Sequence, residues 1–348
     1  MHTNESALGR TATDRELLEA ARRGDESAYR DLVERHRADL HAHCYRMLGS
    51  LHDAEDALQD ALLRAWRGLG RFEGRSSLRT WLYTIATNTC LSVIARRPAR
   101  ALPIDYGPAA DPHDAGSEPL AESTWIEPYP DDQLGLGTGL TAPEARYERR
   151  ESVELAFVAA LQHLAPRPRA VLMLREVLGF SAREVAESLD TTVASVNSAL
   201  QRARRTVEER MPPLSQQATL RTLGDERMRA VVEGYTDALE RGDVDAVLAM
   251  LTEDATWSMP PLPEWYAGHE AITGFLERGP MRQRWRHLGT HANGQLAVGC
   301  YMWDDDAGAY AAQVIDVLTL RGDRVTAITA FIDAGLFARF GLPAAYPG

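Results

Sequence analysis

Apolar side chains recur every three or four residues in three stretches near the start of the chain, running from Tyr29 to Leu48, Ala54 to Leu69 and Leu78 to Val93. Glycine and serine at residues 49–50 and 70–77 separate these stretches. Such spacing places the apolar side chains on one face of a helix. Residues 14–98 are therefore predicted to form a bundle of amphipathic helices.

The next segment, residues 99–144, contains proline and glycine throughout and has no comparable periodicity. Residues 101–145 carry nine acidic residues and no arginine. We expect an acidic flexible linker that is extended and partly disordered. One island of large apolar residues interrupts it, and such groups in a linker usually dock onto another surface. The residues expected to dock are Trp125, Ile126, Pro128 and Tyr129.

A second helical unit is predicted over residues 145–211, ending before Pro212-Pro213. Ser181 and Glu184 have the spacing of a capping box, and residues 190–192 form the turn of a helix-turn-helix. The following helix presents polar groups and arginines that could contact bases and phosphates in a major groove. These residues are Thr192, Ser195, Asn197, Ser198, Gln201, Arg202 and Arg205. The alternative is a helical hairpin with a solvated face.

Residues 225–345 change pattern from helix to strand. Two helices are expected between Asp225 and Leu251, with a break at residues 241–243. Alternating segments at 255–259, 284–292, 295–303, 309–320 and 324–331 follow, with turns such as Asn293-Gly294. Helices followed by a strand meander predict an α+β domain.

The charge is unevenly distributed over these segments. The 348 residues carry a net charge of −12, and all 38 basic residues are arginine. Residues 1–100 contain 16 arginines and 14 acidic residues, and residues 146–210 contain 11 and 9, so both helical units are mildly basic. The linker and the C-terminal segment supply the acidic excess. The whole chain should therefore bind free DNA weakly, since phosphate neutralisation supplies most non-specific affinity.

The remaining composition narrows the class of protein. The polar start of the chain lacks a signal peptide pattern, and no apolar run is long enough to span a membrane. Cys44, Cys90 and Cys300 are far apart and lack metal-type spacing. We expect a reduced cytoplasmic protein with no metal, no cofactor and no membrane partner.

Two surfaces of the N-terminal unit suggest binding. The loop at residues 72–77 and the helix after it combine small residues, arginines and aromatic rings, which suits splayed single-stranded bases. The alternative places Trp66 and Trp81 in the core and Arg75 and Arg79 simply in solvent. The acidic helix from Asp53 to Trp66 could be a solvated helix start, or could dock on a basic protein surface.

Several of these segments resemble a known protein family. The segments Cys44–Ser50, Asp53–Trp66 and Trp81–Asn88 closely resemble region 2 of extracytoplasmic-function (ECF) sigma factors of the sigma-70 family. Arg169–Ala186 with Val196–Arg204 is similar to region 4. The resemblance implies a promoter-specific transcription initiation factor that is not an enzyme. Its partners would be the RNA polymerase core, through the β′ clamp helices and the β flap, and promoter DNA in double- and single-stranded form.

The resemblance also implies residue roles. Core polymerase binding falls to Asp53, Glu55, Asp56, Gln59, Asp60 and Leu63. Recognition of the minus-ten element falls to Phe72, Arg75, Ser76, Ser77, Arg79, Tyr83, Thr87 and Asn88. The helix from Thr192 to Arg205 would contact the minus-thirty-five element, and the linker would replace the absent region 3.

The C-terminal segment resembles SnoaL-like domains, which have the cystatin-like cone fold. The fold expected overall is thus two all-α sigma domains, a region 2 helical bundle and a region 4 helix-turn-helix, plus this α+β cone domain. The cone encloses a pocket, and some relatives are cyclases or isomerases that use an aspartate or histidine. The pocket candidates here are Trp257, Trp265, His269, Trp285, His287, Asp316 and Asp333. Each could instead be a core aromatic, a helix-start residue or a surface acid.

Three hypotheses follow. The preferred one is a sigma factor whose C-terminal domain and linker regulate it in cis by holding the two DNA-binding units closed. The second is a DNA-binding unit fused to a SnoaL-like domain that binds a small molecule or acts as a cyclase or isomerase. The third is a repressor independent of polymerase, against which the net acidity and the surface for single-stranded bases both argue.

Overall fold

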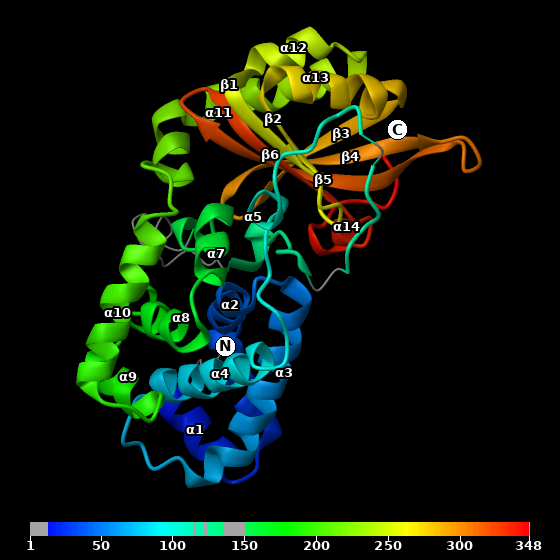
Figure 1. Ribbon diagram of the computed structural model, residues 1–348. Helices are drawn as coiled ribbons and strands as arrows, with labels where there is room; N and C mark the ends of the chain where they lie inside the picture. The colour runs from blue at the N-terminus through cyan, green and yellow to red at the C-terminus, as the bar shows by residue number, and fades with distance from the viewer. Residues whose placement is uncertain (1–12, 115, 122–123, 135–149, 348) are drawn as a thin grey trace, which may run out of the picture.

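The computed structural model describes residues 13–114, 116–121, 124–134 and 150–347, and Figure 1 shows a helical half joined to a half built on a sheet. The first twelve residues, part of the stretch in which we expect no signal peptide, lie outside the described residues. So do residues 135–149, which include the end of the predicted linker and the start of the second helical unit. Among the described residues, no helix is long and apolar enough to cross a lipid bilayer.

The N-terminal bundle consists of four helices, as the apolar pattern predicts. They are α1 (Asp14–Arg22), α2 (Glu26–Leu48), α3 (Leu51–Gly68) and α4 (Leu78–Ile94), with the 3₁₀ turn η1 (Leu69–Arg71) after α3. Each helix starts where a side chain accepts a backbone amide, at Thr13, Asp25, Ser50 and Ser77. Gly49 ends α2 in the left-handed conformation, with a φ of 70°, so that the chain can turn directly into α3.

The second helical unit contains α7 (Leu155–Gln162), α8 (Pro166–Leu172), the π-helical turn η4 (Met173–Val177), α9 (Ala182–Ser188) and α10 (Val193–Glu208). The predicted capping box at α9 is present, because Ser181 Oγ accepts the Glu184 amide and Glu184 Oε2 accepts the Ser181 amide. Asp190 adopts a φ of 49° in the turn between α9 and α10. The geometry is that of a helix-turn-helix.

The described part of the linker is folded back on itself rather than extended. It contains only α5 (Pro103–Tyr106) and the turn η3 (Asp131–Leu134) as regular elements. Ala101 pairs with Trp125 in an isolated bridge, and the Ile126 amide donates to Ala101 O at 3.0 Å. The chain therefore leaves the helical half at residue 101, crosses to the sheet and returns to the same place (Figure 1). The physical reason is burial of Trp125, Ile126 and Tyr129, which are each 3% exposed or less.

The C-terminal half begins with α11 (Gln216–Arg241) and α12 (Val244–Met250). A six-stranded sheet follows in the order β2-β1-β6-β5-β4-β3, in which only the β1–β6 pair is parallel. The strands are β1 (Leu251–Ser258), β2 (Trp265–Ala267), β3 (Trp285–Ala292), β4 (Gln295–Asp304), β5 (Ala309–Arg321) and β6 (Arg324–Ile332). Between β2 and β3 lie α13 (Gly268–Arg278) and the turn η5 (Pro280–Arg282), and α14 (Leu336–Arg339) follows β6.

Two differences from the pattern-based expectation stand out. The first helix starts at Gln216, well before Asp225, and continues through a non-helical Gly224. β2 has three residues, too few to show alternation, and the pattern did not separate it from α13. The five longer strands match the predicted segments to within a few residues.

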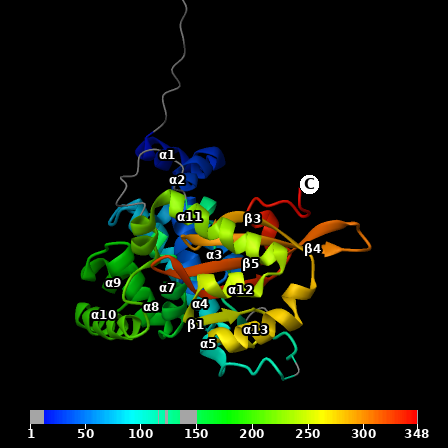
Figure 2. The same cartoon turned by 90° about the horizontal axis from the view of Figure 1, so that it is seen from above.

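The two faces of the sheet have different neighbours. Helices α11, α12 and α13 lie across one face, as the view from above in Figure 2 shows, and enclose one apolar core with it. The other face shares a single cluster of buried residues with the helical half, which includes Leu40, Tyr129 and Leu161 together with Ile315 and Phe331. The linker and the start of the second helical unit thus pack on this face of the sheet through a continuous apolar core.

Candidate functional site

The outward face of α3 carries four of the residues expected to bind polymerase. Asp56, Gln59, Asp60 and Leu63 are exposed, and their spacing places them on one side of the helix. Leu63 is 46% exposed, which is unusual for a large apolar side chain of this protein. Glu55 is half-buried and forms an ion pair with Arg339 of α14 at 3.0 Å. α3 therefore presents an acidic surface with an exposed apolar residue at its C-terminal end.

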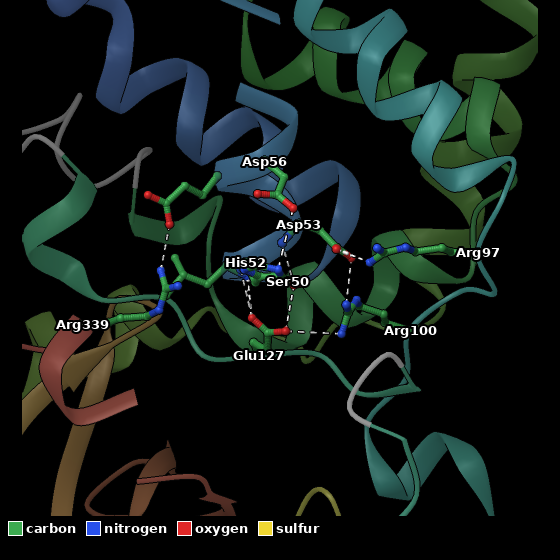
Figure 3. A network of polar contacts seen from close by, with 10 residues as sticks. Ser50, His52, Asp53, Asp56, Arg97, Arg100, Glu127 and Arg339 are labelled. Carbon is green, nitrogen blue, oxygen red and sulfur yellow. Dashed lines mark hydrogen bonds and ion pairs between the residues drawn. The ribbon is translucent and has the colours of Figure 1, made fainter. Parts of the chain in front are cut away.

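Asp53, the sixth residue of that set, lies elsewhere. It is 4% exposed and points away from the outward face. Its carboxylate pairs with Arg100 at 2.8 Å, at the start of the linker, and with Arg97, just before the linker (Figure 3). Its geometry fits a role in fixing the linker to α3.

Glu127 of the linker island occupies the N-terminus of α3. Its Oε2 accepts the amides of Leu51 at 2.8 Å and His52 at 3.2 Å, and its Oε1 accepts the Ser50 hydroxyl at 2.8 Å. A carboxylate at this position is favoured by the unpaired amides and the helix dipole. Arg100 connects the pieces, donating to Asp53 and to Trp125 O at 2.6 Å. Figure 3 shows Glu127 and Arg100 side by side at the start of α3.

The loop and helix expected to bind the minus-ten element divide into exposed and covered residues. Arg75, Ser76 and Ser77 are exposed, whereas Phe72 is buried against Trp81, with 4.9 Å between ring centroids. Tyr83 and Thr87 are 2% and 0% exposed. The Thr87 hydroxyl lies 2.9 Å from His43 Nε2, inside the bundle.

The covered part of α4 faces the second helical unit. Arg79 lies over the rings of Tyr83 and Phe180, at 5.1 and 4.9 Å from their centroids, and donates to Leu178 O at 3.2 Å. The hydroxyls of Thr84 and Ser188 lie 2.8 Å apart. Asn88 Nδ2 donates to Ser188 O at 3.4 Å. Residues 178–188 thus contact one side of the helix that would have to bind single-stranded bases, whereas Arg79 and Asn88 themselves stay exposed.

α10 is in the opposite situation. All seven residues expected to contact the minus-thirty-five element are exposed: Thr192, Ser195, Asn197, Ser198, Gln201, Arg202 and Arg205. Val196, Leu200 and Ala203 anchor the helix to the core behind them. Thr192 starts the helix by accepting the Ser195 amide at 3.1 Å. The helix is available to a major groove in this arrangement.

Asn293, in the β3–β4 turn, joins three parts of the chain and was not singled out from the sequence beyond its Asn-Gly turn signal. It is fully buried, with a φ of 56°. Its Nδ2 donates to Tyr45 OH of α2 at 2.8 Å and to Val153 O at 2.7 Å. Its Oδ1 accepts the Tyr129 amide of the linker at 2.8 Å. One side chain of the C-terminal domain therefore forms hydrogen bonds with polar groups of the bundle, the linker and the second helical unit.

A buried carboxylate lies near this junction. Glu154 is 0% exposed, and its Oε1 accepts the Gln217 amide at the start of α11 at 2.8 Å. Its Oε2 is buried without a hydrogen-bond partner among the described residues. Burial raises the pKa of Glu154 to about 7.

The pocket candidates of the C-terminal domain are brought together only in part. Trp257, Trp285, His287 and Asp316 line one cavity of about 320 Å³ between the sheet and its helices. Trp265 donates instead to Gly107 O of the linker, and His269 contacts Thr252 O. Asp333 is exposed and lies at a separate cavity beside Arg339. Cys300, Gln283 and Gln313 also line the first cavity and were not predicted. Tyr235 and Glu240 lie behind this lining and contact Asp316 and His287. Within the described ranges, no three His, Cys, Asp or Glu side chains gather as metal ligands would.

Three family models match the chain in succession. They are sigma-70 region 2 over residues 32–99, sigma-70 region 4 over residues 154–207 and a SnoaL-like domain over residues 232–328. These matches confirm the predicted fold class, two helical sigma domains followed by an α+β domain.

Two curated relatives show how far the similarity extends. The chain is 43% identical over 338 residues to the ECF RNA polymerase sigma factor SigG of Mycobacterium tuberculosis, covering 92% of this chain and 85% of that protein. It is 28% identical to the ECF RNA polymerase sigma factor SigW of Bacillus subtilis, over 57% of this chain and 96% of the relative. The shorter relative therefore matches the sigma regions, whereas the longer one extends through the C-terminal domain.

A solved structure shares the architecture. The crystal structure of the Mycobacterium tuberculosis extracytoplasmic function sigma factor SigJ matches with a TM-score of 0.55 at 23% identity, over 88% of this chain and 97% of that one. At this identity the match supports the fold. Together with the family matches and the 43% identical full-length relative, it leads to one conclusion: the chain belongs to the ECF RNA polymerase sigma factors and carries a C-terminal SnoaL-like domain.

Proposed function

We propose that this sigma factor is regulated in cis, by a closed arrangement in which its linker and C-terminal domain hold regions 2 and 4 together. The domains involved are residues 14–98, the linker at 99–144, residues 145–211 and the C-terminal residues 225–345. The carrying observation is that residues 178–188 of region 4 pack along one side of α4, the helix assigned to the minus-ten element, and bond to Arg79, Thr84 and Asn88. Promoter opening by this protein would therefore require the two regions to separate.

The closed arrangement is supported by contacts that cross all of the parts. Asn293 bonds to Tyr45, Tyr129 and Val153, and Glu127 caps α3. Arg46 of α2 donates to Ser152 O at 3.0 Å, which links region 2 directly to the start of region 4. These bonds are mostly buried, where an unpaired polar group costs about 1–3 kcal/mol. The parts should therefore separate together rather than one at a time.

We assign the exposed surfaces as follows. The α3 face at Asp56, Gln59, Asp60 and Leu63 binds the β′ clamp helices, and Glu55 joins it once Arg339 is released. Arg75, Ser76, Ser77 and the uncovered face of α4 take single-stranded minus-ten bases. α10 binds the minus-thirty-five duplex while region 4 contacts the β flap. The role is regulatory rather than catalytic, in keeping with relatives that are transcription factors.

A reversible covalent lock tests the proposal. Thr84 and Ser188 have hydroxyls 2.8 Å apart, so the double variant Thr84→Cys with Ser188→Cys places two thiols within reach of a disulfide. The native cysteines are all buried and free, and Cys44 contacts Cys90, so the oxidised wild-type chain is included to account for that pair. Run-off transcription with purified RNA polymerase core would compare oxidised and reduced protein. We expect transcript only from the reduced form, while the oxidised form still binds core polymerase.

The two single-cysteine variants serve as matched controls, because they carry the same side-chain changes without the cross-link. Formation of the disulfide is checked by thiol titration before each reaction. Equal promoter-specific transcription from the oxidised and reduced double variant would refute the proposal, since α4 would then function while covered.

A further inference from the structure

The cavity in the C-terminal domain has walls that suit an apolar ring. Its volume is about 320 Å³, at the lower end of the range for small-molecule sites. Its lining includes three aromatic rings and three flexible thioethers: Trp257, Phe275, Trp285, Met259, Met281 and Met302. Methionine side chains adapt to the outline of a ligand, and the rings offer flat contact surfaces.

The polar side of the cavity contains a buried carboxylate. Asp316 is 3% exposed, and its Oδ2 accepts hydrogen bonds from Tyr235 OH at 2.9 Å and from Cys300 Sγ at 3.4 Å. Burial raises the pKa of Asp316 to about 6, so the group is mostly ionised at neutral pH. Among the described residues, none donates a hydrogen bond to its Oδ1. Since the residue lines the cavity, this oxygen is placed to accept a bond from an occupant.

His287 adds a second acceptor. Its Nδ1 lies 3.3 Å from Glu240 Oε1, and this carboxylate also accepts the His287 amide at 3.0 Å. Burial lowers the pKa of His287, which favours the neutral ring. With Nδ1 donating to Glu240, Nε2 is left as an acceptor, a tautomer that we assign from this contact. The described residues that line the cavity include no arginine, so an acidic ligand would find no counter-charge.

The elements around the cavity also hold the linker. Phe275 lines the cavity, and its neighbour Gly274 packs so closely on Pro112 that a Cβ would lie 3.0 Å from Pro112 Cγ. Trp265 Nε1 donates to Gly107 O, and the Ala110 amide donates to Trp265 O, both at 2.8 Å. The Leu120 amide donates to Pro261 O at 3.0 Å, two residues after Met259 of the cavity wall. Arg278 further bonds to Pro112 O.

We propose that this cavity binds an uncharged, largely apolar ring compound that donates a hydroxyl to Asp316, and that segment 259–282 transmits its presence to linker residues 107–114 and 116–121. The linker continues into the Trp125–Tyr129 island, in which Glu127 caps α3 and the Tyr129 amide donates to Asn293. A ligand would thereby bias the closed arrangement. The inference that a ligand binds depends only on the cavity, whereas its effect on transcription rests on the function proposed above.

The binding step is tested on the purified full-length chain without polymerase. Equilibrium dialysis would compare 2-naphthol, which carries the hydroxyl, with naphthalene, which lacks it, and 2-naphthoate, which is anionic. We expect saturable binding of one 2-naphthol per chain, at least tenfold tighter than naphthalene, and no measurable binding of 2-naphthoate. Absence of saturable 2-naphthol binding, or equal affinity for all three probes, would overturn the proposal.

Two variants within the cavity and one control outside it locate the contact. Asp316→Asn should weaken 2-naphthol at least tenfold and leave naphthalene unchanged, which also reports that the cavity is intact. Asp333→Asn, at an exposed carboxylate outside the cavity, should change neither. Val314→Trp narrows the cavity without touching Asp316, and should abolish binding of both neutral probes. Unchanged 2-naphthol affinity in Asp316→Asn or Val314→Trp contradicts the assigned site.

Amide hydrogen exchange tests the transmission to the linker. Saturating 2-naphthol should change exchange of residues 107–121 several-fold in the wild-type chain and not in Asp316→Asn. A change in exchange confined to residues 257–332 would show that the ligand binds without affecting the linker. It would overturn the proposed transmission to residues 107–114 and 116–121. Because neither measurement uses polymerase, failure here is distinguishable from failure of the disulfide lock, which concerns the closed arrangement itself.

Discussion

Replacing Asn293 by alanine tests how strongly one turn of the C-terminal domain holds the closed arrangement. The change removes all three side-chain hydrogen bonds of Asn293 and leaves Val153 O and the Tyr129 amide buried without that partner. A buried backbone group that loses its partner costs about 1–3 kcal/mol, so the closed arrangement should lose about 2–6 kcal/mol. Alanine at a φ of 56° adds about 1 kcal/mol of backbone strain.

Amide exchange at Leu51 and Leu155 measures this loss. The Leu51 amide donates to Glu127 of the linker, and the Leu155 amide donates to Gln295 of the C-terminal domain. Both amides can exchange when the parts separate, even if each domain stays folded. Since about 1.4 kcal/mol corresponds to a factor of ten, Asn293→Ala should accelerate their exchange at least roughly thirtyfold.

Two further variants separate the contributions. Asn293→Gly loses the same bonds without the backbone strain, so it should be milder than alanine by about 1 kcal/mol. Asn197→Ala, on the exposed face of α10, should leave both amides unchanged in the absence of DNA. Wild-type exchange rates at Leu51 and Leu155 in Asn293→Ala would refute the reasoning, because the turn would then not hold the parts together.

Three other changes have defined outcomes. Glu127→Gln removes the negative charge from the α3 N-terminus and from Arg100, and should lower the free energy of unfolding in urea by about 1–3 kcal/mol; an unchanged transition would contradict the cap. Burial raises the pKa of Glu154 from 4.5 to about 7, so the contribution of this group to the closed arrangement should be largest below about pH 4.5 and fall by roughly 3 kcal/mol as the pH rises to about 7. Glu154→Gln should flatten this part of the stability–pH curve, and a curve with the wild-type slope would exclude Glu154 as its source. Arg205→Ala should weaken binding of polymerase holoenzyme to minus-thirty-five duplexes of any sequence and reduce the salt slope by about 1, whereas a sequence-selective loss would indicate base contact instead.

The elements with local signals were predictable from the sequence. The capping box at Ser181 and Glu184 starts α9 as expected, because both bonds lie within four residues of one another. The apolar period located α2, α3 and α4, and alternation located the five longer strands. β2 and α13 were not separated, since three residues give no period and the helix follows without a break.

The site was predictable only where its residues act from one helix. The exposed face of α10 follows from helical spacing alone. Asp53 has the same local pattern as Asp56 and Asp60, yet it is buried because Arg97, after α4, and Arg100, in the linker, pair with it. Asn293 carried a hairpin signal, but its bonds to Tyr45 and Val153 join segments more than 100 residues away. No periodicity within a short window contains such information.

The bridge between Ala101 and Trp125 has a consequence for the reach of the chain. Because these two residues pair, the 23 residues between them add nothing to the distance that the linker can span. Freed from the sheet, the same residues could contribute up to about 80 Å of contour length. In the closed protein these 23 residues therefore form a loop that does not lengthen the linker. If the bridge opened, regions 2 and 4 could move apart without any domain unfolding.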